Sequence, residues 1–130
     1  MNWLAIVLGT VAFFAVGALW YTVLFGKAWQ RAVGLSDEQL KAGASMPLIF
    51  GACFALEFLV VLTVGHMFAF LEPGDHARMM ITVGLALGVM SPAIGITYLY
   101  MRKPLSLFLI DAGHFVVGMA AVGGVFVALG

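Results

Sequence analysis

Four long runs of hydrophobic residues alternate with short polar segments along the chain. The runs span residues of about 3–25, 47–71, 79–101 and 105–129. A helix rises about 1.5 Å per residue, so about 20 residues cross the roughly 30 Å hydrocarbon core of a bilayer. Each run is long enough to do so. The pattern predicts an all-α integral membrane bundle, a single domain of four transmembrane helices.

The first polar segment, residues 26–46, contains a signal for the start of a helix. Ser36 is followed three residues later by Gln39, which is the spacing of a capping box. In that motif each side chain accepts a hydrogen bond from the backbone N–H of the other residue. The pattern predicts a short helix over residues 37–42, ending near Gly43 and lying at the level of the lipid headgroups.

The composition agrees with a membrane protein and excludes some classes of function. Hydrophobic residues make up 64% of the chain and charged residues 9%, whereas soluble domains carry roughly 25% charged residues. The formal net charge is zero and the basic residues are scattered, so no surface for a nucleic acid is expected. Cys53 is the only cysteine, which excludes an intrachain disulfide.

The basic residues predict how the helices are oriented. Most lie in the first and third polar segments, and only Arg78 lies in the second. Those in the first and third segments are Lys27, Arg31, Lys41, Arg102 and Lys103. Because basic loops tend to remain in the cytoplasm, we expect a multi-pass protein of a bacterial inner membrane with both termini in the periplasm.

One face of the third hydrophobic run consists of small residues at helical spacing. They are Gly84, Gly88, Ser91 and Gly95, and Tyr98 continues the face. Small residues let two membrane helices approach closely. We therefore expect this run to be the central packing helix. We also expect it to contact other copies of the chain, or a larger membrane complex, within the lipid bilayer.

Three of the ionisable side chains inside the hydrophobic runs are predicted to lie at a similar depth, where charge is costly. Glu57 lies about ten residues into the second run, and Asp111 and His114 lie about six and nine residues into the fourth. Both runs would enter from the cytoplasmic side, so these groups should lie within roughly 6 Å of one another in depth. A carboxylate near the bilayer centre costs about 2.5–3.5 kcal/mol on insertion scales, so it should face protein or water.

Aromatic side chains are expected beside these ionisable groups. The first and third runs return to the same side of the membrane, with Trp20, Tyr21 and Tyr98 near their ends. Two interpretations remain open. Either the cluster binds protons or a small ligand, with His114 as the only cationic partner for the carboxyls, or the polar groups fasten the helices through hydrogen bonds.

Neither a metal nor a cofactor is expected at this cluster. One histidine and one cysteine near the carboxyls are few ligands for a transition metal. The sequence also lacks the paired histidine or cysteine motifs that are typical of metal sites.

Several short motifs resemble a known family. The end of the first run reads GALWY over residues 17–21 and LFGKAW over 24–29. GLS at 34–36 leads into the short acidic helix, and LFLIDAGH at 107–114 opens the last run. Together they resemble the bacterial four-span membrane proteins catalogued as domain of unknown function family seventeen sixty-one, over essentially the whole chain. The resemblance implies a four-span fold and a membrane location, and it implies no activity.

The residues favour a non-enzymatic accessory or interaction protein of the membrane. The first alternative is a small proton-coupled transporter or channel that uses Glu57, Asp111 and His114 as its protonatable site. The second is a membrane-embedded enzyme or lipid-binding protein, whose ligand would lie between helices beside the aromatic side chains. No motif for nucleophilic catalysis supports the enzyme.

Overall fold

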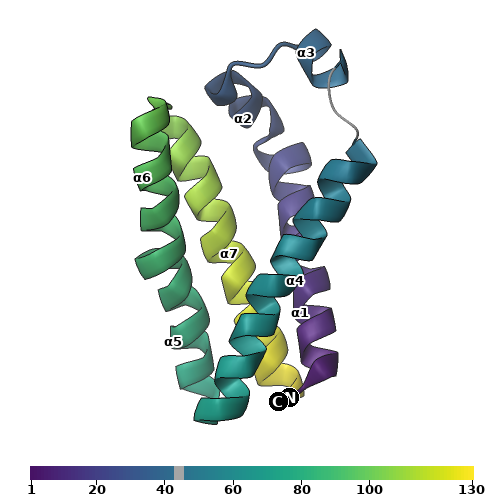
Figure 1. Cartoon of the computed structure of the whole chain (residues 1–130), viewed down its shortest axis with the longest axis vertical. Coiled ribbons are helices and arrows are strands. Elements are labelled where there is room, and N and C mark those ends of the chain that lie inside the picture. Colours follow the sequence, from purple (N-terminus) through teal and green to yellow (C-terminus); the bar gives the residue numbers. More distant parts are fainter. Residues whose placement is uncertain (43–45) are drawn as a thin grey trace.

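Helices and the turns that connect them form the described part of the chain. The computed structural model describes residues 1–42 and 46–130, and it contains no strand within these ranges. Four helical segments are long and apolar enough to cross a membrane, namely Trp3–Leu24, Met46–Leu71, Asp75–Met101 and Leu105–Leu129. The predicted all-α bundle of four membrane-spanning helices is confirmed (Figure 1).

The helical segments are subdivided by π-helical turns. The first segment is α1 (Trp3–Leu19), which continues as the π-helix η1 (Trp20–Leu24). Two short helices follow, α2 (Gly26–Val33) and α3 (Asp37–Ala42). The second segment is α4 (Met46–Leu71). The third comprises α5 (Asp75–Leu85), the π-helix η2 (Ala86–Met90) and α6 (Ser91–Met101), and the fourth is α7 (Leu105–Leu129).

Local hydrogen bonds explain the two short helices between α1 and α4. The predicted capping box is confirmed, because the N–H of Gln39 donates to Ser36 Oγ at 3.1 Å and the N–H of Ser36 donates to Gln39 Oε1 at 2.8 Å. Gly34 ends α2 with φ of 83°, a left-handed conformation that glycine adopts without strain. The expected end of the short helix near Gly43 lies outside the described residues.

The π-helices lie at two points where the spanning segments depart from regular α-helix. In η1, the N–H of Phe25 donates to the carbonyl of Trp20 at 2.8 Å, which makes the turn one residue wider than an α-turn. η2 ends two residues before Pro92, whose ring lacks an N–H and would clash with the carbonyl of Gly88 in a regular α-helix. Single π-turns inside α-helices often mark functional sites.

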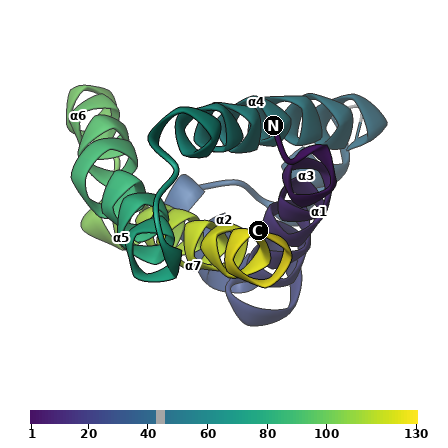
Figure 2. The ribbon, with the colours of Figure 1, turned by 90° about the horizontal axis from the view of Figure 1, so that it is seen from below.

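α7 is the central helix of the bundle. It packs against α1, α5, η2 and α6 and contacts α2, whereas α4 packs mainly against α1. Figure 1 shows that α4 and the α5–α6 segment lie close at the end that contains both termini and diverge toward the other end. Figure 2, seen from below, shows α7 between α5 and α1. The prediction that residues 79–101 form the central packing helix is therefore wrong.

The small residues of the third segment are only partly used in packing within the chain. A Cβ added at Gly84 or Gly88 would meet no atom within 4 Å, and both residues are exposed. Ser91 is buried, and a Cβ added at Gly95 would lie 3.1 Å from the ring of Phe108 on α7. The part of the stripe at residues 84 and 88 thus packs on nothing within the described chain, and its contact with another chain stays a prediction.

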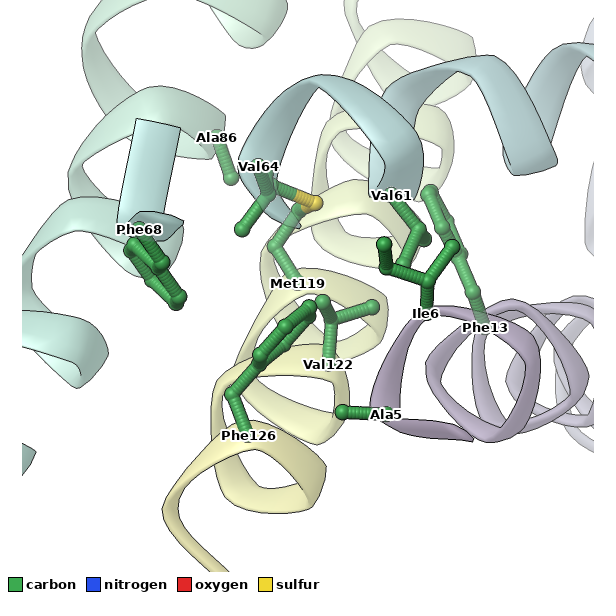
Figure 3. Close-up of a cluster of buried hydrophobic side chains, with 10 residues drawn as sticks. All are labelled: Ala5, Ile6, Phe13, Val61, Val64, Phe68, Ala86, Met119, Val122 and Phe126. Atoms are coloured by element: carbon green, nitrogen blue, oxygen red, sulfur yellow. The ribbon is translucent and has the colours of Figure 1, made fainter. Parts of the chain in front are cut away.

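A buried hydrophobic cluster occupies the half of the bundle nearer the termini. Helices α1 and α4, the π-helix η2 and the C-terminal half of α7 contribute to it (Figure 3). Its members are Ala5, Ile6, Phe13, Val61, Val64, Phe68, Ala86, Met119, Val122 and Phe126. All four spanning segments therefore share one core at this end.

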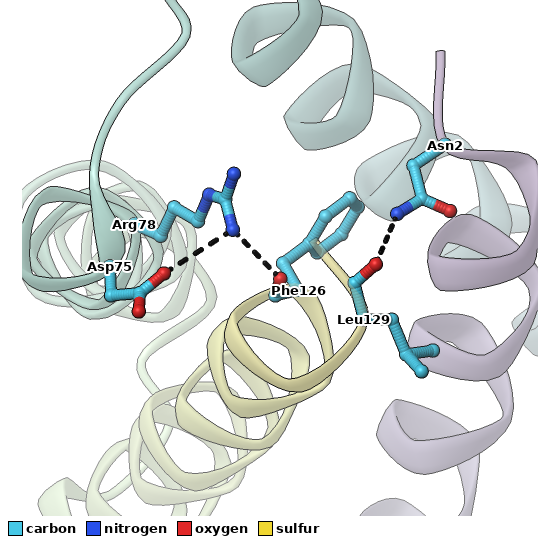
Figure 4. Close-up of polar contacts among 5 residues, drawn as sticks. All are labelled: Asn2, Asp75, Arg78, Phe126 and Leu129. Carbon is cyan, nitrogen blue, oxygen red and sulfur yellow. Dashed lines mark hydrogen bonds and ion pairs between the residues drawn. The ribbon is translucent and has the colours of Figure 1, made fainter.

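Polar contacts also join the segments at this end of the bundle. The side-chain amide of Asn2 donates to the carbonyl of Leu129 at 3.0 Å, and Arg78 donates to the carbonyl of Phe126 at 3.0 Å (Figure 4). Arg78 also pairs with Asp75 at 3.4 Å. Asn2 and Arg78 thus connect the start of α1 and the start of α5 to the last turn of α7.

Large apolar side chains cover the outside of the bundle. Tyr100, Phe70 and Leu99 are 87%, 84% and 80% exposed, respectively. An apolar surface of this kind is unfavourable in water, whereas the helical backbone beneath it has its hydrogen bonds satisfied and tolerates lipid. The surface therefore agrees with four segments that cross a membrane.

A methyl group at Gly118 should destabilise the bundle, because the added Cβ would lie 2.7 Å from the ring of the fully buried Phe13. We expect Gly118→Ala to lower the stability by about 1–3 kcal/mol, the usual cost of overpacking a core. The measurement is thermal unfolding in detergent. Gly88→Ala is the matched control and should not lower the unfolding temperature, since its Cβ meets no atom within 4 Å. Equal losses in the two variants would contradict the packing.

Candidate functional site

Asp111 on α7 connects three membrane-spanning segments through its carboxyl group. The hydroxyl of Tyr21, from η1, donates to Oδ1 at 2.5 Å, and the hydroxyl of Tyr98, from α6, donates to Oδ2. Asp111 is only 6% exposed. Within the described residues it has no cationic partner closer than 4.0 Å. Two tyrosine hydroxyls therefore satisfy this buried carboxyl group.

Trp20 binds α7 beside the same carboxyl group. Its indole Nε1 donates to the carbonyl of Ile110 at 2.8 Å. Its ring also covers Gly113, where an added Cβ would lie 3.0 Å from Cζ2. Neighbouring residues of a regular α-helix point about 100° apart, yet Trp20 and Tyr21 both reach α7. They belong to the wider turn of η1.

His114 lies one turn after Asp111 and is 5% exposed. Its ring packs among aromatic rings, with centroid distances of 4.8 Å to Phe115, 5.1 Å to Tyr21 and 5.7 Å to Phe13. In the described chain neither of its ring nitrogens has a hydrogen-bond partner. Among the described residues, this imidazole is therefore held in place by aromatic contacts and not by hydrogen bonds.

Glu57 approaches His114 from α4. A Cβ added at Gly17 would lie 3.0 Å from Nε2 of His114 and 3.8 Å from Oε1 of Glu57. Oε2 of Glu57 is buried and has no hydrogen-bond partner among the described residues. The carboxyl group and the imidazole thus meet over Gly17 of α1, at a separation greater than the 4.0 Å of an ion pair.

The structure divides the predicted cluster into two adjoining groups. Asp111, Tyr21 and Tyr98 form one hydrogen-bonded group, which we call the Asp111 junction, with Trp20 beside it. Glu57 and His114 form the other around Gly17, and they share no hydrogen bond with the junction in the described chain. Tyr21 belongs to both surroundings, because its hydroxyl binds Asp111 and its ring packs on His114.

A partly open cavity of about 1100 Å³ adjoins the Asp111 junction. Helices α4 and α6 form its two sides, α2 and α3 lie at one end, and α7 and η1 contribute the wall that contains Asp111. The lining residues are Tyr21, Thr22, Gly26, Lys27, Trp29, Gln30, Leu35, Gln39, Leu40, Met46, Ile49, Phe50, Cys53, Ala93, Ile94, Thr97, Tyr98, Asp111 and Phe115. Glu57 and His114 are not among them.

The cavity is lined by both apolar and polar side chains. Ile49 and Ile94 contribute apolar surface from α4 and α6, and Lys27, Gln30 and Gln39 contribute polar groups from α2 and α3. This arrangement suits a molecule with an apolar body and a polar end. The cavity is slightly larger than the usual range of ligand sites, about 300–1,000 Å³.

Metal ligands do not gather in this region. The ranges 1–42 and 46–130 hold no group of three or more His, Cys, Asp or Glu side chains that could bind a metal ion. Cys53 is exposed on the cavity wall. The chemistry available at the cavity therefore comes from hydroxyl, amide, amine and thiol groups together with the engaged carboxyl of Asp111.

Several residues of this region were not singled out by the sequence. Gly17, Phe50 and Ile94 are typical of a hydrophobic run, so their identity alone carries no signal. The spacing of residues along the helix gives a partial signal. Phe50 and Cys53 precede Glu57 by seven and four residues, which places them on the same face of a helix as Glu57.

Removing one tyrosine hydroxyl of the Asp111 junction should destabilise the bundle. We expect Tyr21→Phe or Tyr98→Phe to cost about 0.6 kcal/mol, the average for hydrogen bonds between membrane helices, and no more than about 1.7 kcal/mol. The double variant should cost more than either single one, since Asp111 would then lose both donors. Tyr100→Phe is the matched control, because Tyr100 is 87% exposed. Thermal unfolding that is equally sensitive to Tyr100→Phe would argue against the junction.

The comparisons with known proteins agree with the fold. A family model described as "Protein of unknown function (DUF1761)" matches residues 4–127. Comparisons with curated proteins and with solved structures found no match. The family match covers nearly all of the four spanning segments and includes the Asp111 junction, Glu57 and His114. The chain belongs to the DUF1761 family, whose function is unknown.

Proposed function

We propose that this protein is a non-enzymatic accessory protein of a membrane, and that the cavity between α4 and α6 binds a lipid. The observation that carries the proposal is the cavity itself, which has a volume of about 1100 Å³ and is partly open. The helices on its two sides diverge toward the end where α2 and α3 lie (Figure 1).

The lining supports a lipid as the occupant. Ile49, Phe50 and Ile94 offer apolar contacts to a hydrocarbon chain, and the outer faces of α4 and α6 carry apolar side chains that suit the bilayer. A lipid chain that enters between these helices would therefore contact apolar surface. Lys27 and Gln39 at the polar end are suited to a headgroup that is anionic or accepts hydrogen bonds.

The hydrogen bonds of Asp111 support a structural role for its carboxyl group. Asp111 lines the cavity, and each of its carboxyl oxygens accepts a hydrogen bond from a tyrosine. These bonds join α7 to η1 and to α6, and so they hold one wall of the cavity together.

The proposed lipid site can be tested by filling the cavity. Ile94→Trp replaces an isoleucine of the cavity wall with the bulkier indole ring. Ile96→Trp adds the same ring to the same helix, at a residue that is 58% exposed and does not line the cavity. We expect the lipid that copurifies in mild detergent, measured by mass spectrometry, to fall several-fold in Ile94→Trp and to stay unchanged in Ile96→Trp. Equal lipid content in both variants would contradict the proposal.

A label on Cys53 provides a second, independent test for lipid in the cavity. Cys53 is the only cysteine and it lines the cavity, so a polarity-sensitive fluorophore attached there reports on the occupant without background labelling. Adding a phospholipid extract to delipidated protein should change its emission, and the same label on a Cys53→Ser, Leu48→Cys variant should respond less, because Leu48 does not line the cavity. Crosslinking through Cys53 to a second polypeptide would indicate a partner helix and contradict lipid.

We also propose that the protein lies in a bacterial inner membrane with both termini in the periplasm. The support is the distribution of basic residues, which are concentrated in the first and third polar segments, and α2 and α3 lie at the same end of the bundle as the turn between α6 and α7 (Figure 1).

Labelling with an impermeant maleimide on intact spheroplasts tests this orientation. In a Cys53→Ser background, a cysteine replacing Glu72 should be labelled, because Glu72 lies in the turn before α5, at the end with the termini. A cysteine replacing Glu38 on α3 should be protected until the membrane is permeabilised. The reverse pattern would overturn the orientation and leave the lipid site untouched.

Proton-coupled transport is a second candidate, favoured by one observation. Glu57 and His114 are ionisable groups on different segments that meet over Gly17 with polar atoms lacking partners in the described chain. Uptake driven by a pH gradient in proteoliposomes, abolished by Glu57→Gln and retained in Ile94→Trp, would favour transport over lipid binding.

A further inference from the structure

Glu57 and His114 carry buried polar atoms that the described chain leaves without hydrogen-bond partners. These atoms are both ring nitrogens of His114 and Oε2 of Glu57. An imidazole always offers at least one N–H donor, and the neutral ring also offers one acceptor. Buried polar groups in native proteins are nearly always satisfied by protein or by ordered water. Both side chains therefore point to a bound species.

The two side chains converge on one place. His114 comes from α7 and Glu57 from α4, and Gly17 of α1 lies between them. The position of a Cβ at Gly17 is 3.0 Å from Nε2 and 3.8 Å from Oε1. Because glycine has no side chain, no Cβ separates the imidazole from the carboxyl group at this position.

The groups that face His114 determine which charges can balance one another at this place. From η1 it faces the ring of Tyr21, and from its own helix Asp111, whose two oxygens are engaged by Tyr21 and by Tyr98 of α6. From α4 it faces Glu57. No Lys or Arg of the described residues forms an ion pair with either carboxyl. Charge on Glu57 can therefore be balanced locally only by charge on His114.

We propose that Glu57 and His114 form a buried proton-binding site, in which one proton is shared between the carboxyl group and Nε2 through a bridging water molecule. In one form the proton resides on Glu57, whose O–H donates to the water while the water donates to Nε2. Transfer breaks the O–H bond of Glu57 and forms an N–H bond at Nε2, with the water passing on one proton as it accepts another.

The pair has no net charge in either form, which suits its apolar surroundings. Carboxyl and imidazole are both neutral before the transfer, and carboxylate and imidazolium cancel after it. Buried waters typically make about three hydrogen bonds to polar groups that would otherwise be unsatisfied. This site is separate from the lipid cavity, because neither Glu57 nor His114 lines it.

Infrared spectroscopy of the full chain in lipid nanodiscs tests the proposal. The carbonyl stretching band of a protonated carboxyl group should disappear in Glu57→Gln and persist in Glu72→Gln, the control at an exposed position. In His114→Phe, which keeps an aromatic ring beside Phe13 and Phe115, the pH at the midpoint of this band should move by about one unit or more, as expected for coupled groups.

Two further variants keep the test decisive. His66→Phe changes an exposed histidine on the same helix as Glu57 and should leave the midpoint unchanged. Gly17→Ala retains both titratable groups and inserts a methyl group between them, so it should move the midpoint as His114→Phe does, even if the latter fails to fold. A midpoint that is insensitive to Gly17→Ala and His114→Phe, or a band that survives Glu57→Gln, would overturn the proposal. Neither result would bear on lipid retention.

Discussion

The carboxyl group of Asp111 needs hydrogen-bond donors inside a bundle whose exterior suits only lipid. Lipid chains offer no hydrogen-bond donors, so the donors must come from inside the bundle. Tyr21 and Tyr98 do so from two different segments. Satisfying this one group therefore sets the positions of the first, third and fourth segments relative to one another. The second segment takes no part in the junction, and its N-terminal half diverges from α6. The cavity lies between them as a result.

The two ends of the bundle are stabilised by different interactions. Near the termini, one hydrophobic cluster receives side chains from all four segments, and Asn2 and Arg78 bind the last carbonyls of α7. Packing there is close enough that Gly118 admits the ring of Phe13 against the backbone of α7. At the other end a few directed hydrogen bonds replace the cluster. A bundle that is closely packed at one end can keep a cavity at the other without losing its fold.

Tyr21 contacts both the Asp111 junction and the pair formed by Glu57 and His114. Its hydroxyl donates to Asp111 and its ring packs on His114, while the residue also lines the cavity. Asp111 and His114 lie three residues apart on one helix, yet their surroundings differ. The carboxyl has two donors from the protein, whereas the imidazole has aromatic neighbours and the carboxyl group of Glu57 beyond Gly17. A substitution of Tyr21 would therefore change the surroundings of both Asp111 and His114.

The sequence by itself determined the class of fold and the location of its unusual groups. Hydrophobic runs of sufficient length specify spanning helices because the bilayer requires that length, and Ser36 with Gln39 specifies a helix start because the motif is local. The convergence of Glu57, Asp111 and His114 at similar depth also followed from counting residues. Counting residues did not show which of these three side chains would interact. That depends on helix rotation and on the order of packing, which distant side chains decide together: α7 became the central helix, and Gly84 and Gly88 were left exposed. The pairing of Asp111 with two tyrosines, the meeting of Glu57 and His114 over Gly17, and the cavity arise only from the tertiary structure, because each requires at least three segments to be placed at once.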